Sequence, residues 1–213
     1  MRWLGKDMKR NIKMIQIRRN VFETNSSSTH SIAIPNHRLA EYPRVVHFGI
    51  GGFGWSFEQV NPADYLYTSI LAYYYHPEER EEKLNYLKDV LDRHNILYTM
   101  QEPKFDIWPK EFPGEEWLDS DCGYVDHAGE LSEFLEAVFK DEDTLLNFIF
   151  DGLVFTGNDN SYDDERPFVN RMSPEYECYT YDSKTKKETR EVKKNPYYLE
   201  SYNKDYDWYY KSN

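Results

Sequence analysis

The chain has 213 residues, among them 19 Tyr, 12 Phe and 5 Trp, and a formal net charge of −12. This length fits one domain or one domain with an appendage, and the aromatic content argues against a disordered chain. The acidic charge disfavours direct binding to nucleic acid, because Lys and Arg must displace the counterions of its backbone. No apolar run approaches the roughly 20 residues that span a bilayer.

The first part of the chain predicts strands. Residues 1–13 are basic, but neither an apolar core nor a cleavage site follows them, so they predict an N-terminal extension rather than a signal peptide. The two cysteines make neither a disulfide scaffold nor a zinc site. These features favour a cytoplasmic protein without a membrane partner. Apolar runs then predict strands over residues 14–22, 31–34 and 44–48.

Helical patterns follow in the middle of the chain. Asn61 and Pro62 are typical of an N-cap and a first helical position, so a helix is predicted from there to residue 75. It is apolar nearly all round and should be central. Residues 78–95 predict a second helix and residues 96–100 a strand. Residues 101–120 contain three prolines and little periodicity, which predicts a long loop.

The last third of the chain adds two helices, a strand and a hairpin. Helices are expected at residues 129–140 and 144–150, a buried strand at 152–156, and a β-hairpin that pairs 175–181 with 187–192. These elements predict an α+β fold, with α/β as the alternative: a mixed sheet, about four helices and a C-terminal hairpin appendage. The predicted division is an extension at 1–13, a core domain at 14–165 and a Tyr-rich hairpin and tail at 166–213.

The polar run at residues 24–31 is the first candidate site. Eight consecutive hydrogen-bonding residues between two apolar runs are more than a tight turn needs. Hydroxyls, an amide and backbone N–H groups suit oxyanions, and nearby arginines suit phosphate. The alternative is a polar turn that bonds only to itself. The candidate ligand-binding residues here are Arg18, Arg19, Glu23, Asn25, Ser26, Ser27 and Ser28.

Two further polar segments could complete this site. Asp126 and His127 precede a predicted helix, and an Asp-His pair can hold a metal or orient a base. The segment 158–160 follows a predicted strand, where ligands collect in α/β sheets. The alternatives are a surface histidine and a plain turn. The candidate metal ligands are Asp126 and Asp159, the candidate catalytic residues are His30 and His127, and Asn158 and Asn160 are further candidate ligand-binding residues.

A glycine-rich pattern gives a weaker prediction of a binding site than the polar segments do. Gly49, Gly51 and Gly54 match Gly-x-Gly-x-x-Gly, but a dinucleotide site needs a helix that opens directly on the glycines. The predicted helix begins only near Pro62. A bend that packs Phe53 and Trp55 is therefore the favoured interpretation.

The segment Arg-x-x-Phe-Glu-Thr-Asn-Ser-Ser-Ser-Thr-His-Ser, from Arg19 to Ser31, resembles the opening of a family of uncharacterised phage and prophage proteins of Gram-positive bacteria. Shorter similar segments lie at 48–49, 53–55, 65–68, 124–127 and 156–160. The resemblance covers residues 14–160 in islands. It implies a viral origin and no particular activity.

Two functions are left open by these patterns. In the first, the three polar segments form one pocket for a phosphate-bearing ligand such as a nucleotide, with a divalent metal and metal-assisted phosphoryl or nucleotidyl hydrolysis or transfer. In the second, the chain is a non-enzymatic acidic inhibitor that blocks a host or defence nucleoprotein, as anti-CRISPR proteins do. Charge reversal in the segment 163–165 or in the tail would weaken the second function. Alanine at Asn25, His30, Asp126 and Asp159 would abolish the first.

Overall fold

The structure, a computed structural model, describes residues 28–107, 112–158, 168, 171, 173–182, 184–200 and 205–212. The predicted α+β fold is confirmed: helices pack on a mixed set of sheets. In the described part of the chain, each helix is too short or too polar to cross a membrane.

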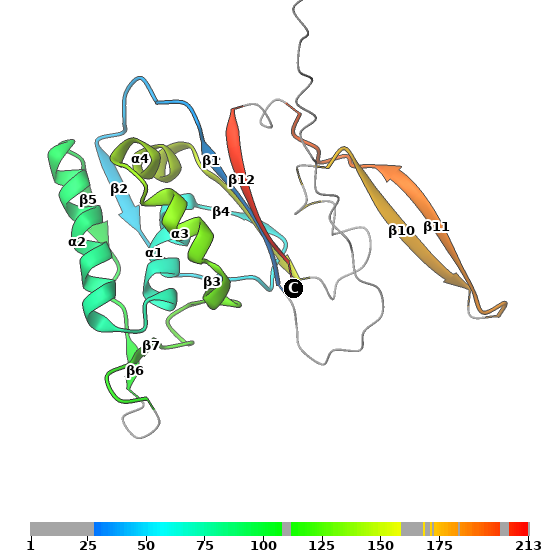
Figure 1. The fold of residues 1–213 in the computed structure, drawn as a ribbon, viewed down its shortest axis with the longest axis horizontal. Coiled ribbons are helices and arrows are strands. Elements are labelled where there is room, and N and C mark those ends of the chain that lie inside the picture. The colour runs from blue at the N-terminus through cyan, green and yellow to red at the C-terminus, as the bar shows by residue number, and fades with distance from the viewer. Residues whose placement is uncertain are drawn as a thin grey trace, which may run out of the picture.

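A four-stranded antiparallel sheet forms the centre, in the order β12-β1-β9-β4 (Figure 1). Strand β1 (Ser28–Pro35) lies between β9 (Leu153–Asn158) and β12 (Tyr206–Ser212), and β4 (Glu58–Val60) pairs with the other side of β9. All eight residues of β1 are buried. The register pairs Ser28 with Asn158, so the N-terminal end of β1 meets the C-terminal end of β9.

The helices cover one face of this sheet (Figure 1). Helix α1 (Pro62–Tyr73) begins as predicted, with the side-chain oxygen of Asn61 accepting hydrogen bonds from the N–H groups of Ala63 and Asp64. It packs beside α4 (Glu142–Asp151) against the sheet. Helix α2 (Pro77–Arg93), the 3₁₀ turn η1 (Ala128–Glu130) and α3 (Ser132–Val138) lie against α1 and α4.

Three small sheets surround the helices. Strand β2 (Val45–Phe48) runs parallel to β5 (Leu97–Met100), and β3 (Gly52–Phe53) runs parallel to β8 (Tyr124–Val125). The stretch 101–120 is not the continuous loop predicted from its prolines. It holds the antiparallel pair β6 (Phe105–Ile107) and β7 (Glu116–Leu118), each too short to show periodicity.

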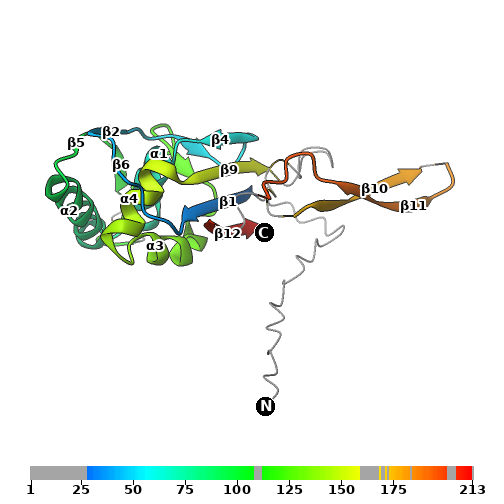
Figure 2. The ribbon, with the colours of Figure 1, turned by 90° about the horizontal axis from the view of Figure 1, so that it is seen from above.

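The predicted C-terminal hairpin is present and lies outside the core. Strands β10 (Glu175–Asp182) and β11 (Lys187–Lys194) pair only with each other, and they extend away from the central sheet in Figure 2. Every residue of β11 is exposed. The end of the chain differs from the predicted division, because β12 returns to the central sheet and pairs with β1 along seven residues.

Candidate functional site

A chain of buried hydrogen bonds joins the described end of the polar run to the core. The His30 ring bonds the Tyr65 hydroxyl through Nδ1 at 2.8 Å and the Ser28 hydroxyl through Nε2 at 3.1 Å. Ser28 Oγ in turn lies 3.4 Å from the backbone carbonyl of Asp126. Ser28, His30 and Tyr65 are each 0% exposed, so the whole chain lies in the protein interior.

The direction of these bonds follows from what each atom can donate. A carbonyl oxygen only accepts, so Ser28 donates its hydrogen to the carbonyl of Asp126. Nε2–H of His30 then donates to Ser28 Oγ, and Nδ1 accepts from the Tyr65 hydroxyl. Burial raises the pKa of Tyr65, which keeps its hydroxyl protonated and able to donate. A buried polar chain that is satisfied in this way holds its members in one arrangement.

Gly54 brings Asp126 close to this chain. It has a φ of +125°, and a Cβ there would lie 2.7 Å from Asp126 Cβ and 2.9 Å from Ser28 Cβ. Asp126 is partly buried, and its Oδ2 lies 3.9 Å from Nε2 of the exposed His127. The glycine at the bend therefore permits β1 and the Asp126 segment to approach each other.

The structure thus brings Ser28, His30 and Asp126 together, with His127 at the rim, and the backbone of Asn158 pairs with Ser28. Their proposed catalytic, ligand-binding and metal-binding roles stay predictions. Within the described residues, no group of three His, Cys, Asp or Glu side chains is arranged to hold a metal ion. The remaining candidates lie outside the described residues: Arg18, Arg19, Glu23, Asn25, Ser26, Ser27, Asp159 and Asn160.

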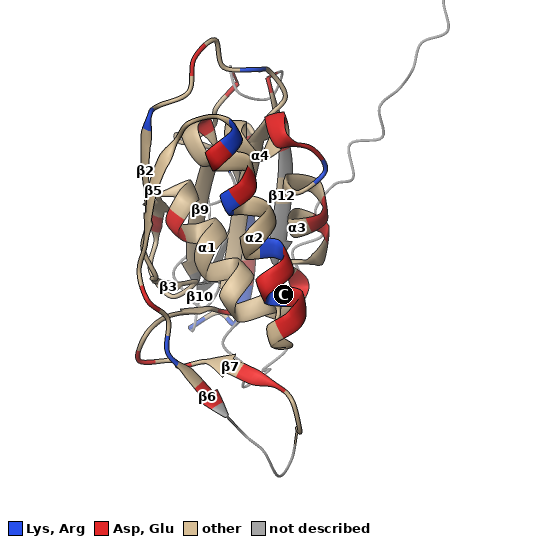
Figure 3. Ribbon diagram, turned by 90° about the vertical axis from the view of Figure 1, so that its left-hand side faces the viewer, with Lys and Arg blue, Asp and Glu red and all other residues tan. Residues whose placement is uncertain are grey.

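Exposed carboxylates gather over α2 and α3 (Figure 3). Residues 128–143 alone hold six carboxylates and a single lysine. Burial, together with the nearby Tyr73, Glu79, Glu136 and Glu82, raises the pKa of Tyr74 to about 12, so carboxylates of both helices act on one phenol. We call this surface the acidic side; its exposed carboxylates are Glu78, Glu79, Glu81, Glu82, Glu130, Glu133 and Glu136.

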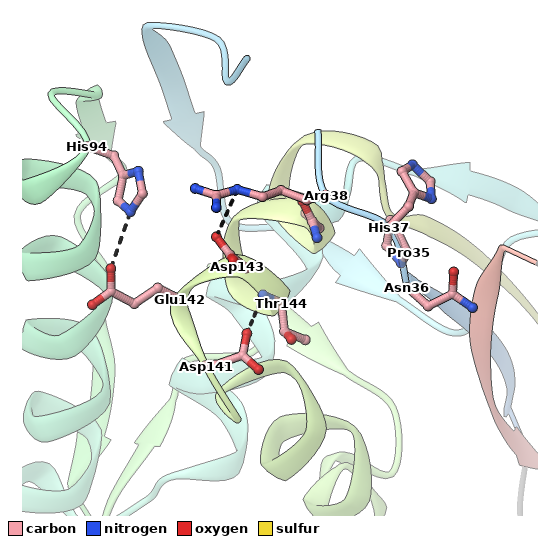
Figure 4. Close-up of a pocket in the computed structure, with 10 residues that line it drawn as sticks. Pro35, Asn36, His37, Arg38, His94, Asp141, Glu142, Asp143 and Thr144 are labelled. Carbon is pink, nitrogen blue, oxygen red and sulfur yellow. Dashed lines mark hydrogen bonds and ion pairs between the residues drawn. The ribbon is translucent and has the colours of Figure 1, made fainter. Parts of the chain in front are cut away.

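A hollow of about 610 Å³ lies between the segment after β1, the end of α2 and the start of α4 (Figure 4). Its charged groups pair with one another. Arg38 Nε lies 3.3 Å from Asp143 Oδ1, and Nε2 of His94 lies 3.2 Å from Glu142 Oε2. The N–H of Thr144 donates to Asp141 Oδ1 at 2.7 Å and caps α4. These pairs join three elements, and the three carboxylates disfavour an anionic ligand here.

The pKa values of this charged hollow agree with a structural role. The Arg93 guanidinium, which donates to Glu142 Oε1 at 2.7 Å, lowers the pKa of that carboxyl. The backbone N–H of Thr144 likewise lowers the pKa of Asp141. Both carboxylates are therefore held in their charged form by partners within the chain.

A second hollow, of about 540 Å³, opens beside the acidic side. Four aromatic side chains line it, from Tyr73, Tyr75, Trp117 and Tyr124. Its described lining contains one carboxylate, Glu79, and no Lys or Arg. The rings of Tyr75 and Trp117 are stacked, 5.4 Å apart and within 7° of parallel. We call this site the aromatic hollow.

The sequence patterns did not identify the central residues of the buried hydrogen-bond chain or of the aromatic hollow. Tyr65 lies in a helix predicted to be central, but nothing in the sequence indicates that its hydroxyl meets His30, 35 residues away. The lining of the aromatic hollow comes from α1, α2, β7, β8 and η1, and Trp117 falls in the stretch predicted as a loop. A surplus of tyrosine and tryptophan was the only signal in the sequence. Comparisons with family models, curated proteins and solved structures give no match to this chain.

Proposed function

We propose that this chain is a phage or prophage protein that binds the basic, nucleic-acid-binding surface of a host or defence protein and thereby inhibits it. The observation that carries the proposal is the acidic side, where exposed carboxylates from α2, from α3 and from the turn before α3 gather on one side of the molecule (Figure 3). Among its carboxylates, Glu79, Glu82 and Glu136 are all exposed.

The physical argument is one of like charges held close together. Such carboxylates repel one another, and the repulsion opposes folding unless a cation lies nearby. Lys83 of α2 is one cation at this surface, and its Nζ lies 5.6 Å from the centre of the Phe139 ring. A basic partner would relieve the repulsion and would be drawn to this surface by its field. Binding should therefore weaken as salt is added.

The experiment compares two variants with the same change in net charge. The first reverses Glu82, Glu133 and Glu136 to Lys on the acidic side. The matched control reverses Glu175, Glu188 and Glu191 to Lys on the hairpin, where Glu188 and Glu191 belong to the fully exposed β11. Each purified chain is immobilised and used to capture proteins from a Gram-positive bacterial lysate, and a captured protein is then tested for displacement of its labelled DNA or RNA.

We expect the unmodified chain and the hairpin control to capture the same nucleic-acid-binding protein and to displace its nucleic acid. The acidic-side variant should need at least a tenfold higher concentration. Equal capture by all three chains would contradict the proposal, as would equal loss in both variants, since that loss would reflect net charge alone.

A second candidate function is binding of a phosphate-bearing ligand, such as a nucleotide, with or without metal-assisted phosphoryl or nucleotidyl transfer. The observation that favours it is the meeting of three polar segments: Ser28 contacts the Asp126 carbonyl and pairs with Asn158 in the sheet. In this proposal the Asp126 carboxylate would hold the metal. It has no role in the first proposal.

Thermal unfolding with a panel of nucleotides, each with and without Mg²⁺, tests this second candidate. A ligand present at 100 times its Kd stabilises the folded state by about 2.7 kcal/mol, which is a measurable rise in Tm. The rise should vanish in Asp126→Asn and persist in Asp106→Asn, a change at an exposed carboxylate in β6. No rise with any nucleotide at millimolar concentration would contradict it.

A further inference from the structure

We infer that the aromatic hollow binds an arginine side chain of the partner. The inference rests on the proposed partner binding and names the chemistry that is recognised. The lining of the hollow contains stacked rings and a carboxylate, which are the two features that a guanidinium uses: its flat face stacks on aromatic rings and its edge pairs with a carboxylate.

The rings are accessible. Tyr75 is 38% exposed and Trp117 is 43% exposed, although each is large and apolar enough to be buried by preference. Phe112, which is 48% exposed, contacts Trp117 with ring centres 6.4 Å apart. Exposed aromatic side chains that adjoin a charged rim are typical of contact surfaces.

The wall that carries these rings is held rigidly. Beneath it, the nearly buried Arg80 pairs with the Glu116 carboxylate of β7 and donates to the carbonyls of Tyr74 and Glu116 at 3.2 and 3.3 Å. The N–H of Glu116 donates to the carbonyl of Tyr75 at 2.8 Å. These bonds fix Trp117 against Tyr75 before any ligand arrives, which lowers the entropy cost of binding.

Two arginines of this protein already lie over aromatic rings. The guanidinium carbon of Arg80 lies 3.8 Å from the centre of the Phe105 ring. That of Arg171 lies 4.1, 4.3 and 5.1 Å from the ring centres of Phe155, Phe168 and Tyr197. In both places a cation of this chain covers the rings, whereas the described lining of the aromatic hollow has rings and Glu79 but no cation.

Charge and shape select arginine over other occupants. A phosphate or carboxylate would meet Glu79 and the adjoining acidic side, and repulsion disfavours it. A lysine ammonium is more strongly hydrated and has no flat face to stack on the Tyr75 and Trp117 rings. A volume of about 540 Å³ has room for the side chain and for the backbone that carries it.

The test uses three peptides that differ at one position: acetyl-Gly-Gly-X-Gly-Gly-amide with X as arginine, lysine or citrulline. Citrulline has nearly the shape of arginine and no charge. Binding is followed in the full chain by NMR, through the indole N–H signal of Trp117, which is assigned by its loss in Trp117→Phe. We expect the arginine peptide to shift this signal saturably, the lysine peptide to bind at least threefold more weakly and the citrulline peptide at least tenfold.

Gly129 provides a way to fill the hollow without changing its charge. Gly129 lines the hollow, and a Cβ added there meets nothing within 4 Å, so Gly129→Leu adds a bulky side chain at the lining without a clash at its Cβ. Gly129→Leu should abolish the shift, and the matched control Gly129→Ala should keep it. Glu79→Gln should weaken binding about tenfold, and Glu188→Gln on the hairpin should not. Circular dichroism and Tm establish that each variant is folded.

The outcomes separate this inference from the proposed function. Equal shifts with the citrulline or lysine peptide would overturn the arginine assignment, and a shift that survives Gly129→Leu would place binding elsewhere. Concentration-dependent association of the chain alone, abolished by Gly129→Leu, would assign the hollow to a second copy and also overturn it. If Gly129→Leu still captures the lysate partner and the acidic-side variant does not, the hollow fails while the proposed function stands.

Discussion

Two regions of the molecule differ in which groups they expose to solvent: the buried chain of hydrogen bonds from Ser28 through His30 to Tyr65, and the aromatic hollow. In the first, hydroxyls and an imidazole are 0% exposed and bond to one another. In the second, tyrosine and tryptophan rings face outward beside a carboxylate. Ser28 and His30, at the described end of the polar run, are inside, whereas the aromatic hollow, which we propose as a contact for the partner, is built largely from aromatic residues.

The difference follows from hydrogen-bond satisfaction. A buried polar group is stable only when it has a partner, and the partners of His30 come from β1 itself and from α1. An exposed aromatic group loses little by staying in water when its polar tip remains hydrated. The first region should therefore govern stability and the second should govern binding.

Mutation of His30 should give the largest effect on stability. His30→Ala removes a fully buried side chain and the partner of both the Tyr65 and Ser28 hydroxyls. The lost contacts and the cavity should lower the free energy of unfolding by about 4 kcal/mol, measured by urea denaturation. His47→Ala is the control, since His47 is exposed and its ring bonds the exposed Thr99 hydroxyl; its cost should stay below about 1 kcal/mol. A folded, fully stable His30→Ala that had lost only nucleotide binding would reverse the division between the two regions.

Gly54 gives the next largest effect, because it combines backbone strain with a steric clash. Gly54→Ala should cost about 3 kcal/mol, from a positive φ and from a Cβ 2.9 Å from Ser28 Cβ and 2.7 Å from Asp126 Cβ. Gly114→Ala separates the two causes: its φ is +89°, but nothing lies within 4 Å of the added carbon. It should cost only about 1 kcal/mol. Equal losses of stability at the two glycines would mean that the close approach of Ser28 and Asp126 contributes nothing.

Much of the fold could be predicted from local patterns. The strands at β1, β2, β5 and β9, helices α1, α2 and α4, and the hairpin all lie within a few residues of their predicted positions. Each of these elements contains a periodic apolar run or a helix cap, such as Asn61 before Pro62, that neighbouring residues alone reveal. Helix α3 begins later than predicted, because His127 takes a left-handed backbone with φ of 53° and a 3₁₀ turn follows it.

Long-range pairing could not be predicted in the same way. The last strand, β12, mixes Tyr and Trp with Asp and Lys, so it has no clear apolar face, and only its contact with β1 makes it a strand of the core. The pairs β6–β7 and β3–β8 are two or three residues long. The meeting of His30 with Tyr65 and the lining of the aromatic hollow depend on this tertiary arrangement, so no spacing in the sequence indicates either.

The smallest expected changes in stability come from single carboxylates. They should distinguish carboxylates that stabilise the fold from those that face a partner. Asp141 accepts the N–H of Thr144 at 2.7 Å, and this bond lowers the pKa of its carboxyl. Because the folded-state pKa lies below the unfolded one, the stabilisation is present above the unfolded value and is lost as the pH falls through the folded value. Asp141→Ala should therefore cost about 1 kcal/mol at pH 7, and the difference from the unmodified chain should shrink as the pH is lowered through the acid range.

Glu136→Gln, on the acidic side, should leave the stability at pH 7 unchanged or slightly raised, because it relieves repulsion around Tyr74. Denaturation curves measured across the acid range distinguish the two, and a loss at Glu136 as large as that at Asp141 would mean that the acidic side is itself part of the structural framework.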